Sequence, residues 1–127
     1  MELEQICIEG ITKTYAISSV KKEFRKAVNE PWKEKTPWLR YQKKLIEDLA
    51  VLEQEMEKAT DLPQFEKLTG EDDLYSIRHP ESKKNVRVIY TIWEEKIILL
   101  TAFLEKNVGD YLRAINVAKG RLIWLFS

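Results

Sequence analysis

The stretch NVRVIYTIWEEKIILLTAFLEKN, residues 85–107, decides the fold of this 127-residue chain. Its two apolar segments are rich in valine, isoleucine and aromatic residues, which predicts two β-strands, Val86–Trp93 and Lys96–Leu104. The intervening pair Glu94-Glu95 predicts a hairpin, but two glutamates are not a favoured turn pair, so we expect a loop longer by one or two residues. An arginine, Arg87, interrupts the first segment and raises the question of what it faces.

The alternation of side chains along the two strands assigns them to faces. With a loop of even length, one face carries Arg87, Ile89, Thr91 and Trp93 opposite Ile98, Leu100 and Ala102. Both faces of the second strand are then apolar. We therefore expect that strand to lie centrally in the sheet and to be covered on both sides.

Other segments complete the predicted fold. A strand is expected over Leu74–His79, and an edge strand within Ile6–Ile17. Apolar residues at helical spacing predict helices from Ser18 or Ser19 to Asn29, over residues 37–59 with Thr36 as N-cap and Pro37 first, and over Tyr111–Leu125 with Asp110 as cap. The predicted class is α+β: a twisted antiparallel sheet of three to four strands, with two N-terminal helices and one C-terminal helix packed on it.

Composition limits the possible functions. A chain that is 44% hydrophobic and 33% charged, with four glycines and four prolines, is expected to form one globular domain over residues 1–127. No segment has the length of a membrane span or the pattern of a signal peptide, so a cytoplasmic protein is expected. One histidine and one cysteine provide no metal-ligand set, and no glycine-rich phosphate loop occurs; we expect neither metal nor cofactor.

One group of basic residues can carry chemistry. Arg78 ends one predicted strand, Arg87 begins the next and Lys106 follows the last, so an antiparallel meander can bring them to one patch. Arginines bind phosphate bidentately and stabilise charge in a phosphoryl transition state, and a lysine can transfer a proton. The alternative is structural, with Arg87 paired to an acid: Glu105, Asp110 or Asp73.

The segment between the first two of these strands is also basic. It contains His79, Lys83 and Lys84, which are candidate RNA contacts. The alternative is a solvated turn over residues 80–84, whose lysines only maintain solubility.

The second half of the chain resembles the RelE/ParE superfamily of bacterial toxins, and more closely its HigB-like phage-type branch. The resemblance lies in FEKLTGEDDLYSIR, NVRVIYTI, IILLTAFLEKN and DYLRAINVAKGRL, in that order. It implies a toxin that pairs with an antitoxin, expected to be a helix-turn-helix protein, and that cuts mRNA on the ribosome without metal. In such toxins the 2′-hydroxyl attacks the adjacent phosphate. Carried over by motif, Arg78, Arg87 and Lys106 are the implied catalytic residues.

Two other functions remain open. Glu105 stands where many of these toxins have a lysine, Ser76 stands where an acidic residue is frequent, and the net charge is zero. These features favour a second hypothesis, a phage-derived or regulatory binding protein without nuclease activity. ParE-type members poison DNA gyrase on the same fold, so fold alone does not determine the target.

Overall fold

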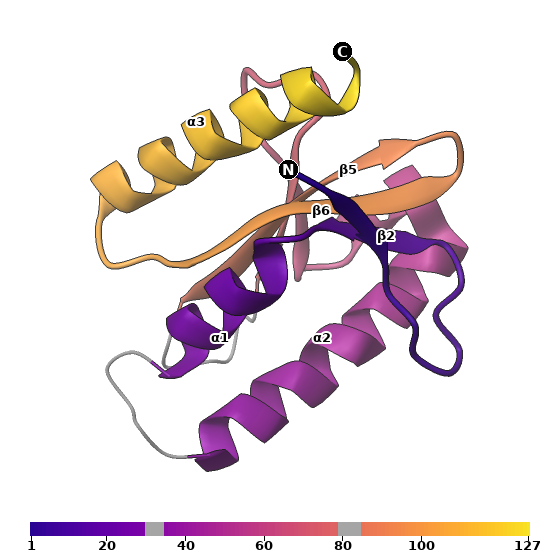
Figure 1. The fold of residues 1–127 in the computed structure, drawn as a ribbon, viewed down its shortest axis with the longest axis vertical. Helices are drawn as coiled ribbons and strands as arrows, with labels where there is room; N and C mark the ends of the chain where they lie inside the picture. Colours follow the sequence, from indigo (N-terminus) through magenta and orange to yellow (C-terminus); the bar gives the residue numbers. More distant parts are fainter. Residues whose placement is uncertain (30–34, 79–84) are drawn as a thin grey trace.

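One mixed sheet with three helices forms the described part of the protein. A computed structural model describes residues 1–29, 35–78 and 85–127. Its sheet has the strand order β1-β2-β6-β5-β4-β3 (Figure 1). The strands are β1 Leu3–Gln5, β2 Thr14–Ile17, β3 Phe65–Lys67, β4 Tyr75–Arg78, β5 Val86–Trp93 and β6 Lys96–Leu104. The α+β class is confirmed, whereas the predicted count of three to four strands is too low, because six occur in these residues.

The sheet is not purely antiparallel. β2 runs parallel to β6, with Thr14 opposite Ile97 and Ala16 opposite Leu99, and every other neighbouring pair is antiparallel. β2 lies inside the segment Ile6–Ile17 for which a strand was predicted, but β1 lies outside it, so β2 is not the edge. The expected central position of β6 is confirmed, since it lies between β2 and β5.

The β5–β6 hairpin has a tighter turn than predicted. Trp93 pairs directly with Lys96, which leaves only Glu94 and Glu95 in the turn. Both glutamates have positive φ, +49° and +61°. Two successive left-handed residues give the type of two-residue turn whose twist matches a hairpin. The expected longer loop was therefore wrong.

A bulge within this hairpin changes the predicted faces. Thr91 pairs with Ile98 as expected, but the register shifts between Ile89 and Tyr90, so that Ile89 pairs with Thr101. The extra residue, Leu100, shifts every later partner by one position. Arg87 consequently lies opposite Phe103, and not on the same face as Ala102.

The helices lie close to the predicted ranges. They are α1 Val20–Asn29, α2 Lys35–Glu55 and α3 Val108–Leu125, and a 3₁₀ segment, η1 Met56–Asp61, follows α2. α2 ends earlier than predicted, next to Met56, whose φ of +51° is incompatible with an α-helix. It also begins at Lys35, so Thr36 and Pro37 lie in its first turn and Thr36 is not the cap.

The start of α3 also differs from the prediction. Asn107 is its N-cap, accepting a hydrogen bond from the Asp110 amide. The Asp110 carboxylate accepts bonds from the amides of Lys106 and Asn107, completing a capping box. Asp110 therefore lies at the third helical position, and the predicted cap was three residues too late.

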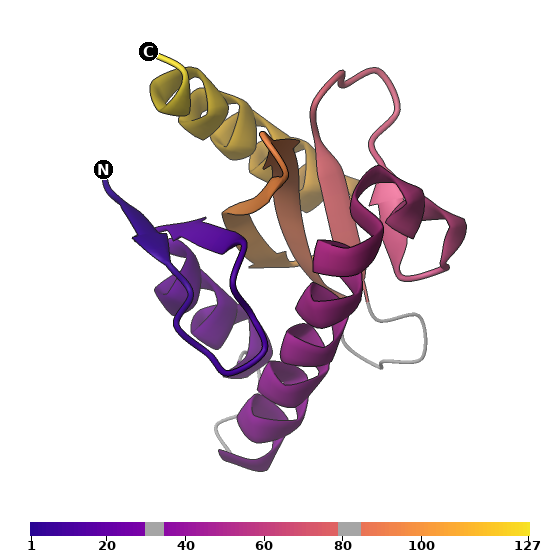
Figure 2. The ribbon, with the colours of Figure 1, turned by 90° about the vertical axis from the view of Figure 1, so that its right-hand side faces the viewer.

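The helices form two layers around the sheet. Figures 1 and 2 show α3 on one side and α1 and α2 on the other. α3 and its C-cap residue Phe126 contact the sheet through two edge-to-face ring pairs, Phe103 with Tyr111 and Trp93 with Phe126. Leu49 and Leu52 of α2 are buried in the core. None of the described helices has the length and apolar character to cross a membrane.

Candidate functional site

Two predicted site residues lie side by side on the sheet. Arg78 of β4 is directly opposite Arg87 of β5, and directly opposed residues of antiparallel strands share a face. Phe103 lies opposite Arg87 on the other side, and its ring contacts Tyr111 of α3. The two guanidinium groups therefore extend from the face that α3 covers. Like charges at such a position repel each other, so each needs compensating partners.

Arg87 is compensated within the chain. Its Nε donates to Glu105 Oε1 at 3.0 Å, and its Nη2 lies 3.0 Å from the same oxygen. The guanidinium also lies over the Tyr111 ring, 5.3 Å from the ring centre. Only 14% of the Arg87 side chain is exposed. The alternative prediction for Arg87, that it pairs with an acidic residue of the chain, therefore matches the observed contacts. The acidic residue is Glu105.

Three polar atoms in this area have no hydrogen-bond partner in the described part of the chain. They are Arg87 Nη1, the Ser76 hydroxyl and the Tyr111 hydroxyl, and all three are buried. Burial raises the pKa of the Tyr111 phenol, opposed by Ser76 and Arg87 nearby, so the phenol remains a hydrogen-bond donor at neutral pH. Ser76 lies near enough to affect that pKa, yet the two hydroxyls do not meet in full hydrogen-bond geometry. Buried donors without acceptors are uncommon and call for an explanation, such as a bound ligand or water.

Arg78 is the more accessible arginine. Its Nε donates to the Pro63 carbonyl at 3.0 Å, and its Nη1 lies 3.8 Å from Glu66 Oε2. The side chain is 42% exposed, and the glutamate is at the limit of ion-pair distance. Arg78 can therefore exchange this weak contact for an incoming anion.

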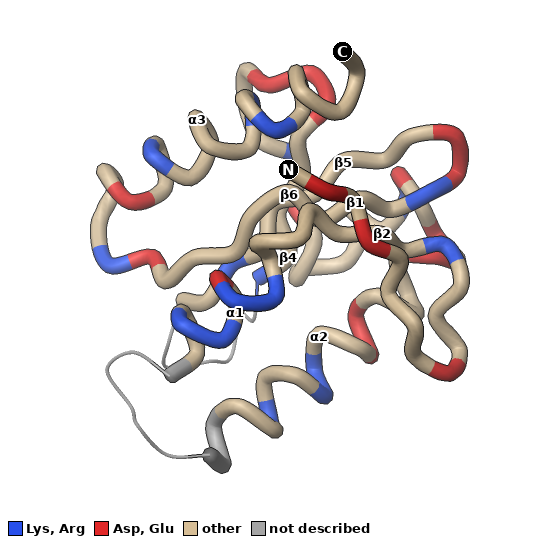
Figure 3. The backbone as a smooth tube through the Cα atoms, in the orientation of Figure 1, with Lys and Arg blue, Asp and Glu red and all other residues tan. Residues whose placement is uncertain are grey.

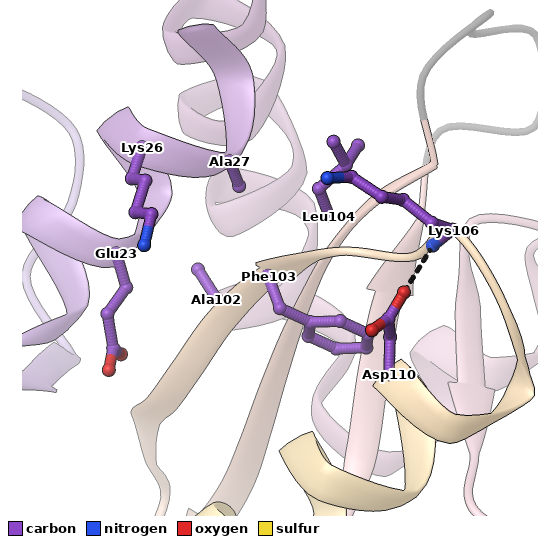
Figure 4. Close-up of a pocket in the computed structure, with 8 residues that line it drawn as sticks. All are labelled: Glu23, Lys26, Ala27, Ala102, Phe103, Leu104, Lys106 and Asp110. Atoms are coloured by element: carbon purple, nitrogen blue, oxygen red, sulfur yellow. Dashed lines mark hydrogen bonds between the residues drawn. The ribbon is translucent and has the colours of Figure 1, made fainter. Parts of the chain in front are cut away.

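Lys106 occupies a different location. It follows β6 and lines a pocket of about 280 Å³ between α1 and the start of α3 (Figure 4). The lining residues are Glu23, Lys26, Ala27, Ala102, Phe103, Leu104, Lys106 and Asp110. Neither arginine lines it. The predicted group of three basic residues is thus an arginine pair on the sheet plus a lysine in the adjacent pocket.

A second polar network holds α1, β6 and α3 together beside this pocket. Arg121 of α3 donates to both carboxylate oxygens of Glu23 at 2.7 and 2.8 Å, and also to the Leu100 carbonyl at 2.7 Å. The Thr101 hydroxyl donates to Glu23 as well. Since Leu100 is the bulge residue, Arg121 satisfies a carbonyl that the bulge releases from regular pairing. These contacts fix α3 over the arginine pair.

The basic surface of the described residues lies on the N-terminal helices. α1 exposes four cations, and α2 adds more along its first half (Figure 3). Those of α1 are Lys21, Lys22, Arg25 and Lys26, and those of α2 include Arg40, Lys43 and Lys44. We call these seven residues the basic helix surface. The predicted RNA contacts His79, Lys83 and Lys84 lie outside the described residues.

The side chains of the arginine pair and of Tyr111 are suited to binding an anion. Among the residues that the structure describes, no group of three or more histidine, cysteine, aspartate or glutamate side chains could hold a metal ion. Arg78 with Arg87 offers guanidinium donors, and Tyr111 adds a protonated phenol. Together these groups can bind a phosphodiester and stabilise negative charge that develops on it.

Sequence reasoning missed three contributors to this area. Tyr111 was counted only as part of an apolar helix stripe, although a tyrosine on the inward side of a helix places its hydroxyl beside the sheet. The bridge between Glu23 and Arg121 joins residues far apart in the chain, so no local pattern indicates it. The signal for the basic helix surface was present in VKKEFRKAVN, where five of ten residues are charged and four of those are basic.

Comparisons with known proteins give a family and a fold neighbour. Residues 38–122 match a family described as phage derived protein Gp49-like (DUF891). Among solved structures, a mutant of the E. coli toxin RelE in the free state is 23% identical, with a TM-score of 0.44, and the alignment covers 80% of this chain and 90% of that chain. A search of curated proteins found no match. Since the family match spans more than half of the sequence, the chain belongs to the phage-derived Gp49-like family.

Proposed function

We propose that this protein is the toxin of a type II toxin-antitoxin pair, with one toxin domain over residues 1–127, and that it is a metal-independent, ribosome-dependent mRNA endoribonuclease. The observation that carries the proposal is the cross-strand pair of Arg78 and Arg87, next to the buried Arg87 Nη1 and the Tyr111 hydroxyl that have no described partner. Membership of a phage-derived family and the toxin-like motifs support the same interpretation.

In the proposed reaction the 2′-hydroxyl of one nucleotide attacks the adjacent phosphorus and gives up its proton to solvent water. The bond to the 5′-oxygen of the next nucleotide breaks, which leaves a 2′,3′-cyclic phosphate and a free 5′-hydroxyl. Arg78, the exposed arginine, binds a non-bridging phosphate oxygen, and Arg87 and the Tyr111 phenol stabilise the charge that develops there. Lys106 lies in the adjacent pocket and not with the arginine pair, so its proposed role as proton donor to the departing oxygen requires the RNA to extend from the arginines to that pocket.

The basic helix surface supplies the RNA attraction that the zero net charge does not. Its seven cations belong to α1 and α2, whereas acidic residues are frequent in β1 and in the β5–β6 turn (Figure 3). Phosphate neutralisation by such a surface is a local property and does not require a basic chain. His79, Lys83 and Lys84 are proposed as further RNA contacts.

Expression of the chain alone in a bacterial host tests the proposal. We expect growth arrest and new 5′ ends in translated mRNA, both lost in Arg78→Gln, which changes an accessible side chain and should preserve the fold. Arg113→Gln is the matched control, because Arg113 is also an exposed arginine, at 70%, but lies on α3. Unimpaired growth with soluble, folded protein would contradict a toxin function.

One observation favours a second function, a non-enzymatic binding protein on the same scaffold. Glu105 binds Arg87 at two nitrogens, so the guanidinium has limited capacity for a phosphate. Glu105→Gln separates the two functions. A nuclease restrained by this carboxylate should cut more in the variant, whereas a protein without nuclease activity should cut in neither form. A gyrase-directed toxin would instead arrest growth with DNA breaks and without mRNA cuts.

A further inference from the structure

The side of α3 that faces away from the sheet carries few charges. Among the described helices, α3 alone covers its side of the sheet (Figures 1 and 2). Its inner side is marked by Ala114 and Ala118, which are buried. Asn116 is two residues from each of them, and at 3.6 residues per turn it lies about 200° around the helix from both. Asn116 therefore lies on the side opposite the sheet.

Four other residues lie within about 40° of Asn116 around the helix. They are Gly109, Leu112, Gly120 and Ile123, and together with Asn116 we call them the outer stripe. Leu112 and Ile123 are 58% and 72% exposed. A surface helix normally places charged and polar residues on this side. Two large aliphatic side chains on one exposed stripe are a feature of interaction surfaces.

Nothing in the described part of the chain requires a glycine at position 120. The φ angle of Gly120 is not positive, so the backbone does not select glycine. A Cβ built on Gly120 would have no described atom within 4 Å beyond its own stretch of helix, so packing does not select glycine either. Gly109 differs, because a Cβ there would lie 3.1 Å from the Asn107 Oδ1 of the cap. Since glycine weakens a helix interior, the open space over Gly120 calls for a side chain from another molecule.

The outer stripe is arranged symmetrically about Asn116. Leu112 precedes Asn116 by four residues and Gly120 follows it by four. Gly109 and Ile123 are each seven residues away, on the two sides. In an antiparallel pair of α3 helices centred on Asn116, each Leu112 lies at the level of Gly120 in the other copy. Each Ile123 likewise lies at the level of Gly109. A large side chain thus meets a glycine at each of these levels, as a self-complementary two-fold interface requires.

Asn116 at the centre of the stripe favours a second copy of the chain over an unlike apolar partner. A carboxamide both donates and accepts, so two Asn116 side chains can satisfy each other across a two-fold axis. Against an apolar surface the same side chain would lose its hydrogen bonds to water. The cations beside the stripe are neutralised within the chain, since Arg113 binds Asp110 and Lys119 lies 3.6 Å from Glu71. Two such faces therefore meet without unpaired charge.

We propose that the protein self-associates through the outer stripe, as a two-fold dimer whose α3 helices pack antiparallel and centre on Asn116. The stripe from Gly109 to Ile123 is about 21 Å long, and a helix pair of that length buries on the order of 1,000 Å² in total. Because this area is below the usual range of stable interfaces, we expect a weak dimer, with a dissociation constant on the order of 10–100 µM. The contact lies on the far side of α3 from the arginine pair and does not depend on the proposed nuclease activity.

Sedimentation equilibrium of the full chain, from about 1 µM to about 1 mM, measures the association. Ile123→Asp places a charge in the stripe at an exposed position and should weaken the dimer about tenfold or more. Leu39→Asp is the matched control, because Leu39 is an exposed aliphatic residue of α2 on the other side of the sheet, and it should change the dissociation constant less than about twofold. Gly120→Gln should weaken the dimer while raising the melting temperature, because glutamine is the better helix former. Loss of the fold cannot produce that combination.

Disulfide trapping tests the antiparallel arrangement. In a Cys7→Ser background, Asn116→Cys lies on the two-fold axis and should give a disulfide-linked dimer on oxidation. Leu112→Cys should not, because its two copies are eight residues apart along an antiparallel pair, about 12 Å, beyond the roughly 7 Å that a disulfide spans. A chain that stays monomeric at millimolar concentration overturns the proposal and leaves the stripe to an unlike partner. So does a dimer that tolerates Ile123→Asp, or equal linkage of the two cysteine variants, which indicates a parallel pair.

Discussion

The charge pair of Arg87 and Glu105 is largely withdrawn from water, with 14% and 19% of the two side chains exposed. Replacing the carboxylate with a neutral amide keeps an acceptor oxygen but leaves a poorly solvated cation without its counter-charge. We expect Glu105→Gln to lower the free energy of unfolding by about 1–3 kcal/mol, less than for a fully buried pair. Glu71→Gln removes the partner of the half-exposed Lys119 and should cost at most about 1 kcal/mol. Urea denaturation of both variants checks this, and equal losses would contradict it.

Asp48 on α2 makes the stability of the protein depend on pH. Burial raises the pKa of its carboxyl above 3.8, opposed by Lys44 at 3.3 Å. The folded protein thus holds the Asp48 proton more tightly than the unfolded chain does. Protonated Asp48 therefore contributes to the free energy of unfolding at pH values below the pKa of the unfolded chain. This contribution is lost as the pH rises through the raised pKa of the folded protein. The stability of Asp48→Asn relative to the parent should therefore increase as the pH rises above about 4. A difference that is independent of pH in urea denaturation would refute this.

At the scale of elements, the β5–β6 turn is the clearest mismatch between sequence and backbone. Glu94 and Glu95 both adopt left-handed φ, a conformation that costs a non-glycine residue roughly 1 kcal/mol or more. Asn-Gly is the pair that favours this turn. We expect Glu94→Asn with Glu95→Gly to raise the free energy of unfolding by about 1–2 kcal/mol, measured by thermal and urea denaturation. The control is the reversed order, Glu94→Gly with Glu95→Asn, which has the same net charge. Its free energy of unfolding should rise by less.

Elements with strong local patterns were predictable, and those defined by distant partners were not. β5, β6 and the three helices follow from β-branched content and helical spacing. β1 and β3 have three residues each, too few for a periodic signal, and the parallel pairing of β2 depends on the whole α1–α2 crossover. The bulge at Leu100 is stabilised by Arg121 from α3, which no local pattern indicates. The juxtaposition of Arg78 and Arg87 was predictable from the meander, whereas the place of Lys106 depends on how the chain leaves β6 toward α3.

At the scale of the whole molecule, a net charge of zero conceals an uneven distribution. The basic helix surface occupies the side formed by α1 and α2, whereas β1 and the β5–β6 turn are acidic (Figure 3). Attraction to a polyanion depends on the phosphates that one surface can neutralise, because each contact releases condensed counterions. A neutral chain can therefore bind RNA with a strong salt dependence when its cations are gathered on one side.

This distribution leads to a quantitative prediction for binding of the chain to single-stranded RNA. Neutralising Lys21, Lys22 and Arg25 to glutamine should reduce the slope of log K against log salt by about 2, since each single-strand phosphate contact contributes about 0.7. Neutralising Lys13, Lys58 and Lys67, three exposed lysines outside α1 and α2, changes the net charge equally and should leave the slope nearly unchanged. Fluorescence anisotropy at several salt concentrations measures both. Equal slopes for the two triple variants would show that RNA responds to total charge, and that the basic helix surface is not a nucleic-acid interface.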